Sequence, residues 1–117
     1  MSSSQANNKG IHFSGICGTA MAALAVLLKQ RGHHICGSDE NVYPPMSEFL
    51  SQNNITVKNG YDAKNLEPVP DLVVIGNALS RRNPEVEAIL ESKLPYISMA
   101  ELLTNKLLGK IKINLKE

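Results

Sequence analysis

Three short turns in this 117-residue sequence contain the residues whose types and spacing could do chemistry. They lie at residues 15–18, 37–39 and 76–80, and each contains a glycine and follows a run that predicts a strand. Glycine lets a backbone approach a ligand closely, and a turn that opens a helix can hold a phosphate with its amides. The turns therefore predict the binding of a nucleotide or another phosphorylated ligand.

The first turn has the clearest local pattern. Residues 11–13 predict a buried strand, Gly15 and Gly18 predict a turn, and residues 19–29 predict a helix because nearly all of them favour helix and none is proline. The first N–H groups of a helix have no partner inside it and lie at the positive end of its dipole. We therefore expect a phosphate between Gly15 and Met21.

Side chains of the other two turns would complete such a site. Asp39 lies about two dozen residues after the first of these glycines, where a nucleotide-binding βαβ unit has a carboxylate for ribose hydroxyls; its other possible role is to cap or solvate a loop. Asn77 offers a donor and an acceptor, and Ser80 offers a hydroxyl. Arg81 and Arg82 could hold a phosphate or carboxylate, or form only an exposed face.

The elements that must position these turns alternate along the chain. The further predicted strands are 33–36, 55–58, 72–75 and 96–97, and the further helical segments are 46–53, 62–66, 83–90 and one that begins after 98. Right-handed crossovers turn this pattern into an α/β, Rossmann-like open parallel sheet of about five strands with helices on both faces. The three turns then share one crevice at the carboxyl ends of the strands.

Two helix starts carry strong signals. Asn83 precedes a proline at the first helical position, and Ser98 is followed three residues later by Glu101, which is a capping box. Glu85 lies in the first turn after Asn83, where a negative charge favours the helix dipole. We therefore expect Glu85 to be a helix-start charge and not a catalytic group.

Composition narrows the classes of function. Twelve basic and eleven acidic residues give a net charge of +1 and aromatic residues are only 4%, which argues against nucleic-acid binding. No apolar run of about 18 residues could span a membrane. Two cysteines, Cys17 and Cys36, make no disulfide framework, and the adjacent His33 and His34 cannot readily share one metal ion. We expect a cytoplasmic protein with a disordered leader at residues 1–9.

Five stretches extend the pattern over most of the chain. In order they are GICGTAMAALA, GSDENVYPPMSEFL, GYDAKNL, DLVVIGNALSRRNPEVEA and LPYISMAELL. Together they resemble the N-terminal domain of the peptidoglycan Mur ligases over residues 11–103. The loop 41–46 favours the branch that recycles a murein tripeptide over the branch that adds L-alanine. Cys17 and Ala23 stand where glycines are common in that second branch.

The resemblance implies a substrate and the residues that bind it. UDP-N-acetylmuramate would place its diphosphate at residues 15–21 and its uridine part beside Ser38 and Asp39, with residues 76–80 and Asn83 toward the sugar. The substrate-binding residues that it implies are Gly15, Ile16, Cys17, Gly18, Thr19, Ala20, Met21, Ser38, Asp39, Asn77, Ala78, Ser80, Arg81 and Asn83.

The resemblance also implies a larger, ATP-dependent amide ligase. ATP and magnesium would be bound by a middle domain and the incoming peptide or amino acid by a third, so this segment would contribute no catalytic residue and no metal ligand. The sequence has no G-x-x-x-x-G-K-[ST] motif, so we expect it to be inactive alone. Residues 10–108 would be the substrate domain and 109–117 a tail toward an absent ATP-binding domain, whether the chain is trimmed or the gene truncated.

Two alternatives remain open. One is the corresponding domain of the ligase that adds L-alanine to UDP-N-acetylmuramate. The other belongs to a different class and is a stand-alone Rossmann module that binds NAD. Its G-x-G-x-x-G pattern is incompletely matched, because Cys17 and Ala20 occupy the second and third glycine positions.

Overall fold

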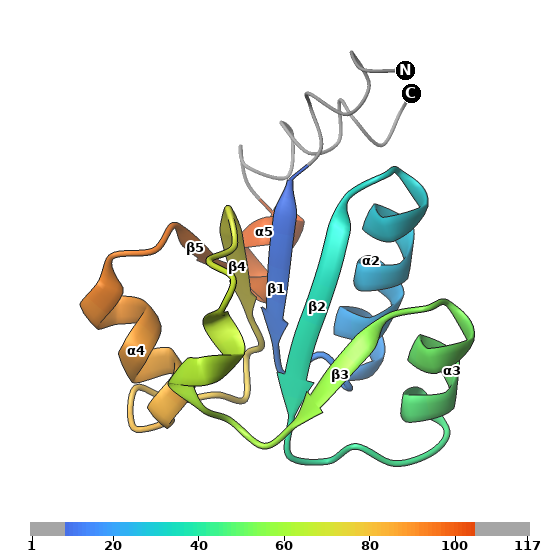
Figure 1. The fold of residues 1–117 in the computed structure, drawn as a ribbon, viewed down its shortest axis with the longest axis horizontal. Coiled ribbons are helices and arrows are strands. Elements are labelled where there is room, and N and C mark those ends of the chain that lie inside the picture. Colours follow the sequence, from blue (N-terminus) through green and yellow to red (C-terminus); the bar gives the residue numbers. More distant parts are fainter. Residues whose placement is uncertain (1–8, 105–117) are drawn as a thin grey trace.

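The computed structural model of the chain describes residues 9–104, and within them five parallel strands form one sheet in the order β3-β2-β1-β4-β5 (Figure 1). The predicted α/β architecture is confirmed. The strands are β1 (Gly10–Ser14), β2 (His34–Asp39), β3 (Thr56–Asn59), β4 (Leu72–Ile75) and β5 (Tyr96–Ser98). The helices are α2 (Thr19–Gln30), α3 (Met46–Gln52), α4 (Pro84–Ser92) and α5 (Met99–Thr104), with a 3₁₀ turn, η1 (Ala63–Leu66).

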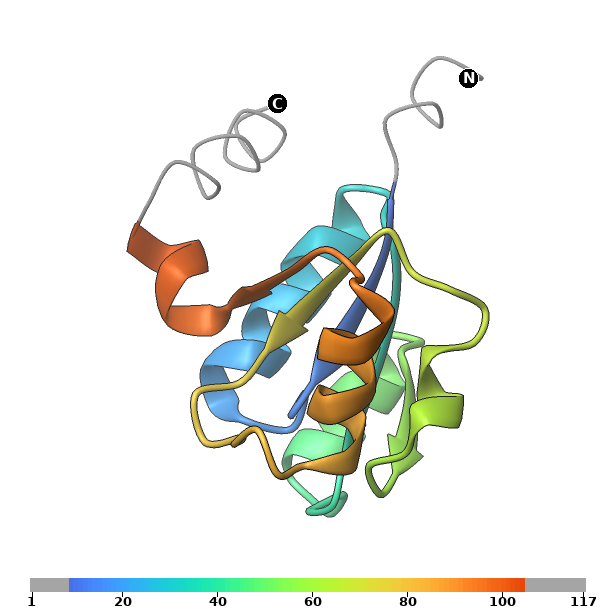
Figure 2. The same ribbon diagram turned by 90° about the vertical axis from the view of Figure 1, so that its left-hand side faces the viewer.

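The strand order creates a switch point in the middle of the sheet. β1 is central, and the chain proceeds from it to β2 and β3 on one side and later to β4 and β5 on the other. In Figures 1 and 2, α2 and α4 lie on opposite faces of the sheet. At such a point the loops that follow neighbouring strands separate, which leaves room for a ligand at their carboxyl ends.

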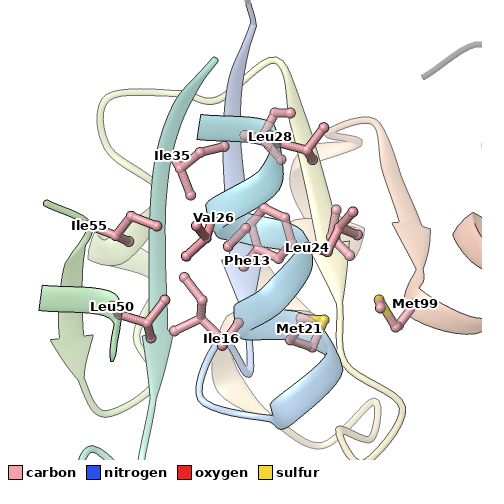
Figure 3. Close-up of a cluster of buried hydrophobic side chains, with 14 of the residues drawn as sticks. Phe13, Ile16, Met21, Leu24, Val26, Leu28, Ile35, Leu50, Ile55 and Met99 are labelled. Atoms are coloured by element: carbon pink, nitrogen blue, oxygen red, sulfur yellow. The ribbon is translucent and has the colours of Figure 1, made fainter. Parts of the chain in front are cut away.

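One face of the sheet is covered by an apolar core. Ile11 and Phe13, at alternate positions of β1, belong to one buried cluster with Leu24 and Leu28 of α2. Figure 3 shows Phe13 packed beneath α2. Leu50 of α3 and Met99 and Leu102 of α5 join this cluster, so all three helices cover that face. The period-two alternation of β1 therefore fixes which way the strand faces.

The opposite face is only partly apolar. Val73 and Ile75 of β4 pack with Val86 and Ile89 of α4, and Leu66 of η1 completes this second cluster. The rest of this face is occupied by the side chains at alternate positions of β1 and β2 and by one from α4. These polar side chains are nonetheless fully buried: His12, Ser14, Ser38 and Glu85.

Several predicted boundaries are confirmed by hydrogen bonds. Asn83 Oδ1 accepts from the N–H groups of Glu85 at 2.9 Å and Val86 at 3.2 Å, as an N-cap does. Ser98 Oγ accepts from the N–H of Glu101 at 3.1 Å, and Glu101 Oε1 accepts from the N–H of Ser98 at 3.3 Å, which completes the capping box. The signals in the sequence therefore located both helix starts.

Among the described strands β4 keeps its predicted bounds, and the other four differ from theirs, β2 the most. β2 runs to Asp39, three residues beyond the predicted end, because Gly37 and Ser38 pair with β1 on one side and with β3 on the other. β3 begins at Thr56 and not at residue 55. The predicted leader and the tail from residue 109 lie outside the described residues, apart from residue 9.

Gly37 allows β1 and β2 to pack under the first turn. A Cβ at this position would lie 2.8 Å from the carbonyl oxygen of Phe13 and 2.7 Å from Ile16 Cβ. We expect Gly37→Ala to lower the free energy of unfolding by about 1–3 kcal/mol in urea denaturation, since backbone must move to admit the methyl group. Gly10→Ala is the control, because its nearest neighbour would lie 3.6 Å away. Equal stability of the two variants would contradict this packing argument.

Candidate functional site

A cleft of about 550 Å³ opens at the carboxyl ends of the central strands. The glycine turn and the start of α2 form its floor, the segment after β2 forms one wall, and the segment after β4 forms the other. Within the described residues its lining contains no lysine, arginine or histidine. The lining residues are Gly15, Cys17, Gly18, Thr19, Ala20, Met21, Asp39, Glu40, Asn41, Tyr43, Pro44, Pro45, Met46, Tyr61, Gly76, Asn77, Ala78, Leu79 and Met99.

The backbone amides at the start of α2 divide into two groups. Those of Gly15 and Ile16 donate to the carbonyl oxygen of Ser38 at 2.8 and 3.0 Å, which ties the turn to β2. Cys17 and Gly18 also have acceptors, since the N–H of Cys17 donates to Asp39 and that of Gly18 donates to the carbonyl oxygen of Gly15. The amides of residues 19–21 have no acceptor among the described residues, because the N-cap Gly18 has no side chain to offer one. These three N–H groups, at the positive end of α2, are available to an anion in the cleft.

Asp39 holds the turn and the wall of the cleft together. Its Oδ2 accepts from the N–H of Cys17 at 2.9 Å, and its Oδ1 accepts from the N–H of Asn41, also at 2.9 Å. Only 6% of Asp39 is exposed. The structure thus gives Asp39 a role in shaping the loop, and the remaining lone pairs of its carboxylate can still accept from a ligand. Burial and then the Asp39 charge raise the pKa of the Cys17 thiol.

Sequence reasoning missed the aromatic wall of the cleft. Tyr43 and Tyr61 line it, and they follow the carboxyl ends of β2 and β3. The pKa of Tyr61 is raised by burial and by the nearby carboxylates of Asp39 and Glu40, so Tyr61 stays a neutral hydrogen-bond donor. The position of Tyr61, three residues after the predicted strand 55–58, was a usable signal, because ligands bind at that edge of such a sheet. Tyr43 lies farther from its predicted strand, 33–36, and carried no such signal.

Below the cleft, on the α4 face of the sheet, lies a buried charge. The Glu85 carboxylate accepts from the hydroxyls of Ser14 and Ser38, and its Oε2 lies 2.9 Å from His12 Nε2. The predicted helix-start charge is therefore in the first turn of α4 but is fully buried, which the sequence pattern did not indicate. We call these four side chains, with Cys36 and Asn65 that also bond to them, the Glu85 network.

The comparisons with known proteins agree with this geometry. A sequence pattern described as "Mur ligase family, catalytic domain" matches residues 10–109. The chain belongs to the Mur ligase family. The UDP-N-acetylmuramate–L-alanyl-γ-D-glutamyl-meso-2,6-diaminoheptandioate ligase of Escherichia coli (strain K12) is 59% identical over 88 residues, which are 75% of this chain and 19% of that protein.

Two further relatives are similar to this chain at lower identity. A murein peptide ligase from Psychrobacter arcticus 273-4, solved by crystallography, superposes with a TM-score of 0.74 at 47% identity, over 77% of this chain and 19% of that one. A UDP-N-acetylmuramate–L-alanine ligase of Psychrobacter sp. (strain PRwf-1) is 37% identical over 95 residues, 81% of this chain and 20% of that protein. The chain thus spans about a fifth of the length of these Mur ligases.

The structure brings most of the residues implied by the Mur ligase resemblance to one cleft. Ile16 and Ser38 lie directly beneath it and are fully buried, so that Ile16 packs in the core and Ser38 bonds to Glu85. Ser80, Arg81 and Asn83 do not line it. The residues that do are Gly15, Cys17, Gly18, Thr19, Ala20, Met21, Asp39, Asn77 and Ala78.

Three of the residues implied by the Mur ligase resemblance also make hydrogen bonds within the fold. Asn77 Oδ1 accepts from the N–H of Ala100 at 3.3 Å, so the wall after β4 is attached to α5. Ser80 Oγ accepts from the N–H of Arg82, and Asn83 caps α4.

In residues 9–104 no three His, Cys, Asp or Glu side chains are arranged to hold a metal ion, and no helix there is long and apolar enough to cross a membrane.

The buried pair in this Mur ligase domain makes its stability depend on pH. Burial opposes the charge of His12, but the hydrogen bonds that His12 makes to Cys36 and to the Glu85 carboxylate outweigh this effect and raise the pKa of His12 from 6.5 to about 9. Burial likewise opposes the charge of Glu85, but its bonds to His12 and the two serines lower its pKa from 4.5 to about 2. Both groups are therefore charged at neutral pH.

The pH dependence of unfolding tests this pair. The His12 contribution is complete below pH 6.5 and is lost as the pH rises through about 9, and the Glu85 contribution is complete above pH 4.5 and is lost as the pH falls through about 2. The free energy of unfolding in urea should decline from pH 6.5 to 9 in the unaltered chain and lose that decline in His12→Gln. A decline of the same size in both proteins would contradict the assignment.

Proposed function

We propose that this chain is the UDP-N-acetylmuramate-binding domain of an ATP-dependent ligase that attaches L-Ala-γ-D-Glu-meso-diaminopimelate to that substrate in peptidoglycan recycling. The observation that supports this most strongly is the open start of α2, whose free N–H groups face a cleft in a chain of the Mur ligase family. The ligase names of the E. coli and P. arcticus relatives supply the reaction.

The diphosphate is the part of this substrate that suits the floor of the cleft. Because the lining in the described residues has no cationic side chain and includes Asp39 and Glu40, attraction for an anion must come from the amides of residues 19–21. The uridine part would lie toward Asp39 and the wall with Tyr43 and Tyr61, which offers polar and aromatic contacts. The sugar would lie toward residues 76–80, with Arg81 and Asn83 nearby in sequence.

Gly18 supports a ligand at this position. Its φ of −65° and ψ of 147° suit any residue, and a Cβ there would meet its nearest atom at 3.6 Å, so the fold does not require glycine. Serine, threonine or aspartate at an N-cap would bond to the free amides and stabilise the helix. A glycine at this N-cap leaves the amides open, which is what an anion-binding site needs.

ATP and magnesium belong, in this proposal, to parts of the ligase outside these residues, because the sequence has no phosphate-loop motif. The choice of tripeptide over L-alanine rests on the higher identity to the tripeptide ligase, 59% against 37%. The two free thiols, Cys17 and Cys36, fit a reducing compartment such as the cytoplasm.

A second candidate function is supported by one observation. The strand order β3-β2-β1-β4-β5 with a carboxylate at the end of β2 is also the arrangement of NAD-binding domains. Titration calorimetry with UDP-N-acetylmuramate, UDP and NADH separates the two functions. We expect heat with both UDP ligands and none with NADH, and NADH binding without a response to either UDP ligand would overturn the ligase assignment.

Gly18→Asp tests the anion site directly. The aspartate should cap α2 and keep or raise the free energy of unfolding by a few tenths of a kcal/mol, about the difference between these two N-caps. It should also weaken UDP binding by about tenfold or more, because it occupies the same amides and repels the diphosphate. Thermal unfolding and calorimetry measure the two effects. An aspartate variant that binds UDP as tightly as the original chain would remove the diphosphate from the start of α2.

A further inference from the structure

The Glu85 network lies on the α4 face of the sheet, and none of its members lines the cleft. Its carboxylate nevertheless bonds to the residues from which the floor and one wall of the cleft begin. We propose that Glu85 is a positioning residue for the substrate cleft, holding the diphosphate turn and the segment after β3 in their binding geometry from the opposite face of the sheet. This inference rests on the proposed function, but its test can be separated from it.

One oxygen of Glu85 joins the ends of the two central strands. Oε2 accepts from the hydroxyl of Ser14, the last residue of β1, and from the hydroxyl of Ser38 at 2.5 Å. Ser14 directly precedes the glycine turn, and Ser38 directly precedes Asp39. A single acceptor thus fixes the spacing of the two strand ends where they enter the cleft.

From Ser38 the constraint continues into the floor of the cleft. Its carbonyl oxygen accepts from the N–H groups of Gly15 and Ile16, and the next carboxylate, of Asp39, accepts from the N–H of Cys17. Three consecutive amides of the turn therefore depend on where Ser38 and Asp39 lie. The N–H of Gly18 then donates to the carbonyl oxygen of Gly15 within the same turn, and the free amides of α2 come next, so a shift of β2 at Ser38 would move them relative to the cleft.

The second oxygen of Glu85 holds the other side. Oε1 accepts from Asn65 Nδ2 at 2.8 Å and from the N–H of Asp62 at 3.3 Å. Asp62 is adjacent to Tyr61, which lines the cleft, and Asn65 in turn donates to the carbonyl oxygen of Gly60. The two oxygens of one side chain thereby connect the diphosphate turn with the aromatic wall.

Only a carboxylate can serve all of these donors. A carboxylate accepts at both oxygens, whereas a glutamine of the same shape has an NH₂ group in place of one of them. Whichever side this NH₂ group faces, the serine hydroxyls or Asn65, it cannot accept from the donors there. His12 supplies a donor from β1 at 2.9 Å, and its charge offsets that of the buried carboxylate. Glu85→Gln is therefore the variant that changes the acceptors with the least change of volume.

The experiment compares Glu85→Gln with Ile89→Ala in the 117-residue chain. Ile89 is fully buried on the same helix and the same face, and it belongs to the apolar cluster and not to the Glu85 network. Glu85→Gln should weaken binding of UDP-N-acetylmuramate by about tenfold or more, the size expected for polar groups left without partners. The affinity of Ile89→Ala for UDP-N-acetylmuramate should stay within about twofold of that of the original chain, since the substitution leaves the network intact. This should hold even if its melting temperature falls as far as that of Glu85→Gln.

Amide chemical shifts of the free proteins supply the second readout. In Glu85→Gln the signals of residues 15–21 and of Tyr61 should move, and in Ile89→Ala they should not. Glu85→Asp, which restores the charge, should recover part of the affinity. If Glu85→Gln does not fold, Ser38→Ala, which removes one hydroxyl and keeps the backbone carbonyl, should move the same signals to a smaller extent.

Different outcomes would overturn the proposed function and the positioning role of Glu85. If the original chain does not bind UDP-N-acetylmuramate, the proposed function fails, and the amide signals still decide whether Glu85 positions the cleft. If Glu85→Gln and Ile89→Ala lose affinity equally at equal loss of melting temperature, Glu85 stabilises the fold only. Unchanged signals at residues 15–21 in a folded Glu85→Gln would also overturn the inference.

Discussion

The candidate site depends on one buried carboxylate being fully satisfied. A charge without exposed area is tolerated only when donors and an opposite charge surround it, and Glu85 finds them on β1, β2 and the segment after β3. α4 packs on the sheet with this side chain inward, and the hydroxyls of Ser14 and Ser38 at the strand ends donate to it. Packing of the helix and alignment of the strand ends are therefore coupled.

The two faces of the sheet are consequently stabilised by different interactions. The α2 face is apolar, and its packing resembles that of any α/β domain, with Phe13 and Leu28 fully buried in it (Figure 3). On the α4 face, hydrogen bonds replace part of the apolar packing. Hydrogen bonds allow a smaller range of distances and angles than dispersion contacts do. These hydrogen bonds are made at the ends of β1 and β2, next to the cleft. They therefore restrict the positions of the strand ends there, although the polar side chains of the network do not line the cleft.

Patterns within a few residues of each other predicted much of the fold. Asn83 with its proline and Ser98 with Glu101 marked two helix starts, because capping is a local interaction, and the alternation of strands and helices predicted the parallel sheet. The burial of Glu85 was not predictable in this way. A glutamate in a first helical turn has the same local pattern whether it is solvated or buried, and its partners are 20 to 73 positions away in the chain.

The same limit applies to the cleft. The glycine turn predicted free amides over residues 15–21, but bonds to β2 and within the turn use those of residues 15–18 and leave those of residues 19–21. Amides donate along fixed directions and carry no net charge, so they recognise a phosphate by its position more than by long-range attraction. With Asp39 and Glu40 in the lining, and no cationic side chain there in the described part of the chain, recognition must depend on the direction of those few N–H groups. The geometry that the Glu85 network imposes on the turn is therefore what such a site requires.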